Sequence, residues 1–152
     1  DHFLEHHWLF SFTGDSQKAI GYQSPRPILP EPLLAARVFE FIRDGMERQV
    51  QDWPDLSLYQ ALAVTCKKLI TDYPGEYIFF LANETVLFAF LNHAQVLSYQ
   101  PPEAAGESLI LTTVSGGLSR DPEHWRLYPN PDRNRGQILI ISGADLLYQG
   151  YL

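Results

Sequence analysis

The histidines near the start of the chain are the first residues whose type and spacing could bind a metal. His2 and His6 are four residues apart, which puts them on one face of a helix, and His7 follows directly. Neutral imidazole is a common zinc ligand. However, Glu5 is the only nearby carboxylate, and no cysteine is close in the sequence. We therefore interpret these histidines as incidental and expect no metal site.

Serine, aspartate and histidine occur together later in the chain. Ser119, Asp121 and His124 have the side-chain types of a hydrolytic triad, with Ser115 as a second candidate nucleophile. All of them fall in one stretch, whereas triads are assembled from separate elements with the nucleophile on a strained turn. We expect a loop there. The stretch is locally basic because it contains Arg120, Arg126, Arg133 and Arg135. It is either a solvated loop or a surface that docks an acidic partner.

A single cysteine, Cys66, is the only thiol in the sequence, so no internal disulfide can form. It falls on the same apolar stripe of an expected helix as Leu62 and Leu69. We predict that Cys66 is a small core residue and not a nucleophile.

The composition is that of an ordinary globular protein. The 152 residues, of which 45% are hydrophobic and 19% charged, suffice for one domain with a real core, and we expect one over residues 1–152. A net charge of −7 with scattered Lys and Arg disfavours nucleic acid as a partner.

No membrane span or secretory signal is visible, so we expect a cytoplasmic protein. Because the sequence opens with Asp1, we expect a processed chain, a fragment, or a sequence given only from that point.

Two amphipathic helices are predicted in the first half. Val38, Ile42 and Met46 recur at helical spacing within residues 33–51. A second helix is predicted to start at residue 55 or 56 and to end at residue 71, between two proline-containing turns. Before them, residues 8–12 are typical of a buried strand, and the proline-rich residues 15–32 of a connection.

The second half of the chain has the pattern of strands. They are expected at residues 77–82, 86–91, 95–99, 108–114, 138–142 and 146–151, the first three spaced as a hairpin meander, with a loop over 115–137. Helices followed by strands predict an α+β layered fold and not a doubly wound sheet. Several strands are apolar on both faces, so we expect cover on both sides of the sheet.

Four short motifs in a fixed order resemble those of the class II glutamine amidotransferases. Residues 8–14, Trp-Leu-Phe-Ser-Phe-Thr-Gly, resemble a family strand of the form Trp-x-Phe-x-His-Asn-Gly. Residues 33–39, Leu-Leu-Ala-Ala-Arg-Val-Phe, resemble a Thr-Asp-Ser-Glu helix entrance that continues Arg-x-Phe. Residues 82–84 are similar to an Ala-Asp-Gly hairpin. Residues 111–118, followed by Trp125 and Gly136, are similar to a Val-Thr-Ser-Glu-Pro-Leu strand and loop with a later Trp and Pro-Gly.

The resemblance covers nearly the whole chain as the second half of the family domain. It implies an αββα sandwich of the N-terminal-nucleophile hydrolase type, incomplete or trimmed. In the active family an N-terminal cysteine attacks the side-chain amide of glutamine, and an Asn side chain and a Gly N–H hold the oxyanion.

The positions that match this chemistry are altered in the chain. The resemblance makes Thr13 and Gly14 the oxyanion-hole equivalents, and makes Leu34 and Ala35 the equivalents of glutamine-binding residues. Asp1 stands where the nucleophile would be, and Leu34 replaces the aspartate that pairs with the ammonium of glutamine. We therefore predict no catalytic residue, no cofactor, and glutamine binding only if these losses are compensated.

Two functional hypotheses follow from the resemblance. The first is a non-catalytic amidotransferase-like domain that acts as a binding or scaffolding module, with the former cleft filled by Leu33, Leu34 and Phe12. The second is a fragment or subunit of an active class II amidotransferase or amidohydrolase whose nucleophile lies on a missing N-terminal half. In either case the resemblance implies that a protein partner or that missing half covers exposed sheet. An unrelated α+β protein, with Thr13 as a turn residue and Leu34 as a core residue, is the remaining interpretation.

Overall fold

The computed structural model of the chain describes residues 7–16, 31–92, 97–100, 110–112, 126–128, 136–143 and 145–152. In chain order the elements are β1 (Leu9–Ser16), α1 (Glu31–Asp52), α2 (Leu58–Asp72), β2 (Gly75–Ala82), β3 (Leu87–Leu91), β4 (Leu97–Gln100), β5 (Ile110–Thr112), β6 (Arg126–Tyr128), β7 (Gln137–Ser142) and β8 (Asp145–Tyr151). Helices followed by antiparallel strands confirm the predicted α+β class. No helix in these ranges is long and apolar enough to cross a bilayer.

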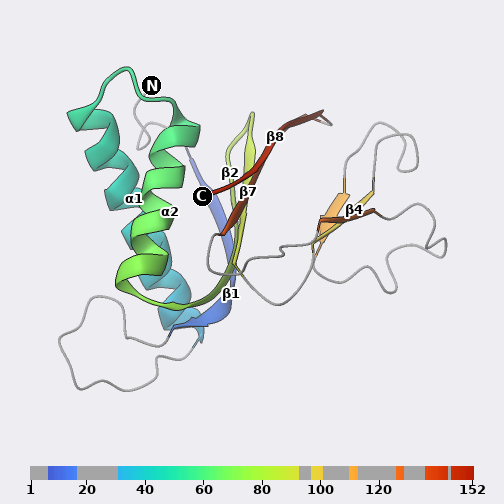
Figure 1. Cartoon of the computed structure of the whole chain (residues 1–152), viewed down its shortest axis with the longest axis horizontal. Helices are drawn as coiled ribbons and strands as arrows, with labels where there is room; N and C mark the ends of the chain where they lie inside the picture. The colour runs from blue at the N-terminus through green and yellow to red at the C-terminus, as the bar shows by residue number, and fades with distance from the viewer. Residues whose placement is uncertain are drawn as a thin grey trace.

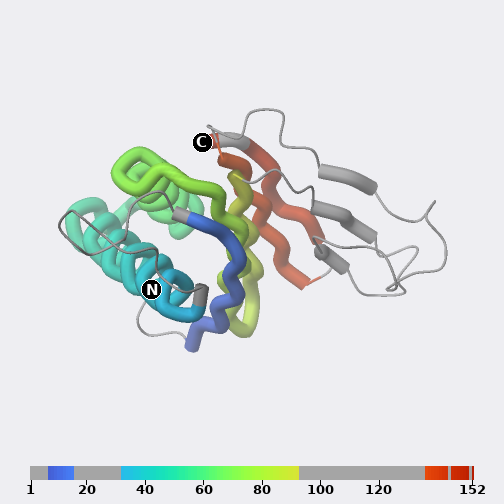
Figure 2. Tube along the Cα trace, turned by 90° about the horizontal axis from the view of Figure 1, so that it is seen from below, coloured from blue at the N-terminus to red at the C-terminus, as the bar shows by residue number. Residues whose placement is uncertain are grey.

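The main layer is a five-stranded antiparallel sheet with the strand order β1-β2-β3-β7-β8. Its two helices pack side by side on one face (Figure 1). Seen from below, they form one layer and the strands from β1 to β8 form the next (Figure 2). A second, three-stranded sheet has the order β5-β4-β6. The strands β1 and β8 are therefore the two edges of the main sheet.

The hydrophobic core lies between the helices and the face of the main sheet that they cover, called here the helix face. Val38, Ile42 and Met46 of α1 are fully buried there, which confirms the predicted apolar stripe. Aromatic side chains of three neighbouring strands meet this stripe, with Phe79 of β2 contacting both Phe10 of β1 and Phe90 of β3. Aromatic contacts of this kind add to the stability gained from burial alone.

The opposite face of the sheet, called here the far face, is also buried over its central strands. Ile78, Ala89, Leu91 and Leu139 form a second cluster there, each no more than 1% exposed. The expected cover on both faces is thus confirmed for β2, β3 and β7. At the edge strand β1 the pattern changes, because Leu9 is 77% exposed and the next far-face side chains along β1 are exposed as well.

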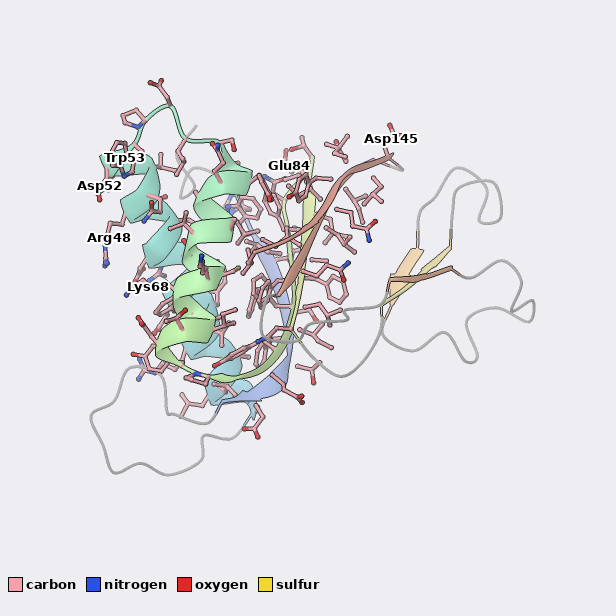
Figure 3. The ribbon with its side chains drawn as sticks, in the orientation of Figure 1. Arg48, Asp52, Trp53, Lys68, Glu84 and Asp145 are labelled. Carbon is pink, nitrogen blue, oxygen red and sulfur yellow. The ribbon has the colours of Figure 1, made fainter. Side chains whose placement is uncertain are left out.

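Polar side chains fix the ends of the central hairpin. The Asn92 side chain accepts a hydrogen bond from the Tyr77 N–H at 2.7 Å and donates one to the Gly75 carbonyl at 3.0 Å. At the other end, Ser142 Oγ donates to the Thr85 carbonyl at 2.9 Å. This bond joins the β2–β3 and β7–β8 turns, which lie at the same end of the sheet near Glu84 and Asp145 (Figure 3).

Several predicted boundaries were wrong. The second helix begins at Leu58, two or three residues later than predicted, because Ser57 and Gln60 form a reciprocal capping box that sets its start. The first helix begins at Glu31, because a proline fits its first turn. The strand β1 runs to Ser16 and not to residue 12, since it pairs with β2 along its full length.

Two further expectations about the strands were wrong. The third strand of the predicted meander, β4, does not join β3; β3 pairs with β7, and β4 pairs with β5 and β6. The strand β6 lies inside the predicted loop of residues 115–137. A three-residue strand is too short to produce a period-2 signal, and pairing between distant segments leaves no local pattern in the sequence.

Gly45 gives a test of how closely the two helices approach. A Cβ at Gly45 would lie 2.5 Å from Thr65 Cγ2, and the β-branched Thr65 is buried and stiff. We expect Gly45→Ala to lower the free energy of unfolding by about 1–3 kcal/mol, although alanine favours helices. Urea denaturation measures this loss.

The matched control is Thr65→Ser, which removes Cγ2 but keeps the hydroxyl that donates to the Ala61 carbonyl. The loss caused by Gly45→Ala should be smaller in the Thr65→Ser background than in the wild type. Additive losses would contradict the close contact.

Candidate functional site

Thr13 and Gly14, which the sequence resemblance predicts as oxyanion-hole equivalents, lie within the edge strand β1 and not in a turn after it. Gly14 pairs with Tyr77 of β2 and has a φ of 156°. A Cβ there would lie 2.2 Å from the carbonyl oxygen of Glu76. Glycine is therefore required at this position by the close packing of β1 on β2, whatever other role it has.

The backbone N–H of Gly14 points away from the sheet. Its partner Tyr77 directs its own N–H and carbonyl to Asn92 on the β3 side. In an antiparallel ladder the residue opposite such a group belongs to a non-hydrogen-bonded pair, so Gly14 turns its N–H outward. By alternation Phe12 and Phe10 do the same. We call this outward side of β1 the open edge, since no described strand pairs with it.

The Thr13 side chain lies on the far face. Thr13 pairs directly with Ile78, a member of the far-face cluster, and directly paired residues share a face. It is exposed, as are its neighbours Ser11 and Asp15 on the same face. A hydroxyl here is solvated and has no partner fixed by the described residues.

Leu34 and Ala35 lie in the first turns of α1, on the other side of β1. Leu34 is 4% exposed and belongs to the helix-face core, where Phe12 packs against the same cluster. Ala35 is half-buried. Leu33 is 39% exposed and does not belong to that cluster. Of the three residues expected to fill the former cleft, the core therefore contains Leu34 and Phe12.

Neighbouring residues of β1 therefore point to opposite faces of the sheet, and only one of these faces contains Leu34. Phe12 contacts the helix-face core that holds Leu34, whereas Thr13, one residue later, faces the opposite way. The arrangement offers the outward backbone donors of β1, including Gly14, and an apolar helix entrance.

Comparison with solved structures gives a match to the overall fold. The chain is similar to the crystal structure of a predicted glutamine amidotransferase from Pseudomonas aeruginosa PA01, with a TM-score of 0.62 and 14% sequence identity. The match covers 94% of this chain and 60% of that one, so the chain spans less than two thirds of that protein. At this identity the likeness shows the fold alone. No family model and no curated protein sequence matches the chain.

Cys66 is buried in the middle of α2, as predicted for a core residue. It is fully buried among the apolar side chains of the helix-face core. Burial without a compensating charge raises the pKa of the thiol well above its usual value. The thiolate needed for nucleophilic attack is therefore not formed at neutral pH.

The remaining candidate residues are distributed as follows. His7 is exposed at the start of the described chain. Residues 2, 6, 115, 119, 121 and 124 lie outside the described residues, as do arginines 120, 133 and 135, while Arg126 begins β6. Within the described ranges no three His, Cys, Asp or Glu side chains come together as metal ligands.

Sequence reasoning missed a tyrosine pair that joins α2 to the edge strand β8. The Tyr59 hydroxyl donates to the Tyr148 hydroxyl, and the ring centroids are 4.2 Å apart. Burial, reinforced by this hydrogen bond, raises the pKa of Tyr59 from 10.0 to about 12. No local signal could have revealed the pair, because its members are 89 positions apart.

Cys66 should react with a thiol reagent only when the fold opens. At pH 8 we expect labelling of the native chain to be at least about 1000-fold slower than labelling in denaturant, because the thiol is buried and protonated. Mass spectrometry measures both rates, and Cys66→Ala is the unlabelled control. Comparable rates in the two states would contradict the core assignment.

The tyrosine pair predicts a loss of stability at alkaline pH. Because the folded chain holds the Tyr59 proton more tightly than the unfolded chain, the free energy of unfolding should fall as the pH rises from 10.0 towards 12. Tyr59→Phe should flatten this fall while lowering stability at pH 7 by about 1 kcal/mol. Denaturant titrations at several pH values test it; an equally steep fall in the variant would contradict it.

Proposed function

We propose that this chain is a glutamine amidotransferase-like domain that does not hydrolyse glutamine by itself and acts as a binding or scaffolding module. The observation that carries the proposal is the burial of Leu34. A residue that pairs with the ammonium of glutamine must be charged and reachable, whereas Leu34 is 4% exposed within an apolar cluster.

The oxyanion-hole equivalents support the same conclusion. Gly14 keeps an outward backbone donor, but the exposed Thr13 side chain turns to the opposite sheet face from the Leu34 core. Losing one oxyanion donor slows catalysis by about 10² to 10³. The one thiol in the sequence, Cys66, is buried and protonated. A non-catalytic domain is consistent with these features, whereas an active enzyme would need other residues to replace the missing groups.

A second candidate function is favoured by the extent of the structural match. The similar Pseudomonas protein is longer, and 40% of its chain has no counterpart here. This chain would then be part of an active class II amidotransferase, whose nucleophile and remaining strands lie on another segment or subunit. The complete fold would be an αββα sandwich, with that protein partner or N-terminal half covering the exposed sheet at β1.

Paired substitutions at neighbouring leucines test the proposal. Leu34→Asp should lower the free energy of unfolding by about 3–5 kcal/mol, since it buries a carboxyl group among apolar side chains. Leu33→Asp, at the exposed neighbour, should change it by less than about 0.5 kcal/mol. Denaturant titration measures both.

Glutamine titration calorimetry and an ammonia-release assay complete the test. The wild type and both variants should neither bind nor hydrolyse glutamine. A Leu34→Asp variant that stays stable and binds glutamine would overturn the proposal, because Leu34 would then line an accessible cleft.

Assays on protein purified from its native source distinguish the two candidate functions. An active assembly would release ammonia from glutamine, and an electrophilic glutamine analogue would stop the release by modifying a cysteine other than Cys66. If the purified material releases no ammonia and no copurifying polypeptide reacts with the analogue, the result supports the binding module.

A further inference from the structure

We propose that the open edge of β1 pairs with the same edge of a second copy of this chain, so that two main sheets join into one across a two-fold axis. The inference rests on the first of the two proposed functions, because the missing half in the second would cover the same edge. It rests on the backbone groups of β1, on the match of its side chains to themselves, and on the contrast with the other edge of the sheet.

The backbone of β1 is ready to accept a strand. Phe10, Phe12 and Gly14 direct their N–H and carbonyl groups outward, as argued above from the Tyr77 hydrogen bonds. Natural edge strands are usually blocked by lysine, proline or a bulge. The eight residues of β1 contain neither lysine nor proline, and their pairing with β2 has no register shift.

The other edge strand, β8, is irregular by comparison. Its pairing with β7 shifts register between Ile140 and Ile141, which is the bulge that commonly protects an edge. Tyr148 of β8 is also held by the hydrogen bond from α2. The unblocked edge of the main sheet is therefore β1.

One antiparallel register makes β1 complementary to itself. With Ser11 opposite Ser11 of the second copy, Phe10 lies opposite Phe12 on the helix face, and Leu9 lies opposite Thr13 on the far face. Aromatic pairs directly opposite each other stabilise antiparallel strands. The register also places the outward groups of Phe10 and Phe12 opposite each other, as a hydrogen-bonded pair requires. Moving it by two residues in one direction would set Leu9 opposite Asp15 and Phe10 opposite Gly14. Moving it in the other direction would keep an aromatic pair, Phe10 opposite Phe10, but would set His7 opposite Thr13 in place of Asp15.

Charges at the ends of the ladder favour the same register. His7, exposed just before β1, would lie opposite Asp15 of the second copy. Asp15 already pairs with Glu76 across β1 and β2, which places two carboxylates in neighbouring positions. An imidazole N–H can donate a hydrogen bond to a carboxylate, and Asp15 is the one charged residue in β1. The pairing therefore brings no like charges of β1 together, in spite of the net charge of −7.

Charge complementation at Ser11 tests the proposal. Sedimentation over a range of concentrations should show the wild type in a monomer–dimer equilibrium. Ser11→Lys and Ser11→Glu each place like charges opposite one another on the axis, and each should raise the dissociation constant at least about fivefold. An equimolar mixture of the two variants should form a heterodimer that is tighter than either homodimer. The difference should shrink at high salt.

The fold should tolerate these changes, because Ser11 is exposed. Melting temperatures equal to that of the wild type, all measured at a concentration where the wild type is monomeric, verify this. Leu147→Lys, at an exposed position on β8, is the matched control and should leave the dissociation constant unchanged.

A wild type that stays monomeric at all concentrations overturns the proposal. A dimer that is weakened by Leu147→Lys but not by Ser11→Lys also overturns it, because β8 would then be the interface. A mixture that fails to restore the dimer excludes the register with Ser11 on the axis.

Discussion

The pairing of β1 with β2 is the contact on which the candidate site depends. Its register runs unbroken from Leu9 opposite Ala82 to Ser16 opposite Gly75. Because side chains alternate along a strand, this one register sends Phe12 into the core and Thr13 to the other face. A slip by one residue would reverse both. The register of β1 with β2 thus determines both the packing of Phe12 and the exposure of Thr13.

The entrance of α1 is packed in a way that does not suit a charged ligand. A site for a charged ligand needs a counter-charge and a path to solvent, and both oppose tight apolar packing. At Leu34 the packing is complete, and Phe12 contacts the same cluster. The apolar character of the two motifs is therefore one structural feature, and a single restored polar residue would weaken the core before it created a site.

Much of this fold could be predicted from local patterns. The apolar stripe of Val38, Ile42 and Met46 gave the first helix, and the capping box of Ser57 and Gln60 is a signal that could have given the true start of the second. The sheet order could not be predicted, because pairing of β3 with β7 joins distant segments. The direction of the Thr13 side chain depends on the register of β1 with β2, which also joins distant segments, so the sequence could nominate this residue but not show which way it points.

The outward backbone donor of Gly14 has a physical cause that is independent of any glutamine site. Its outward N–H follows from the alternation of hydrogen bonds along β1, and glycine is kept there by the 2.2 Å approach to the Glu76 carbonyl. Neither cause requires glutamine. Backbone donors on a strand edge can bind a ligand or pair with another strand, so the outward N–H of Gly14 needs no glutamine site to explain it.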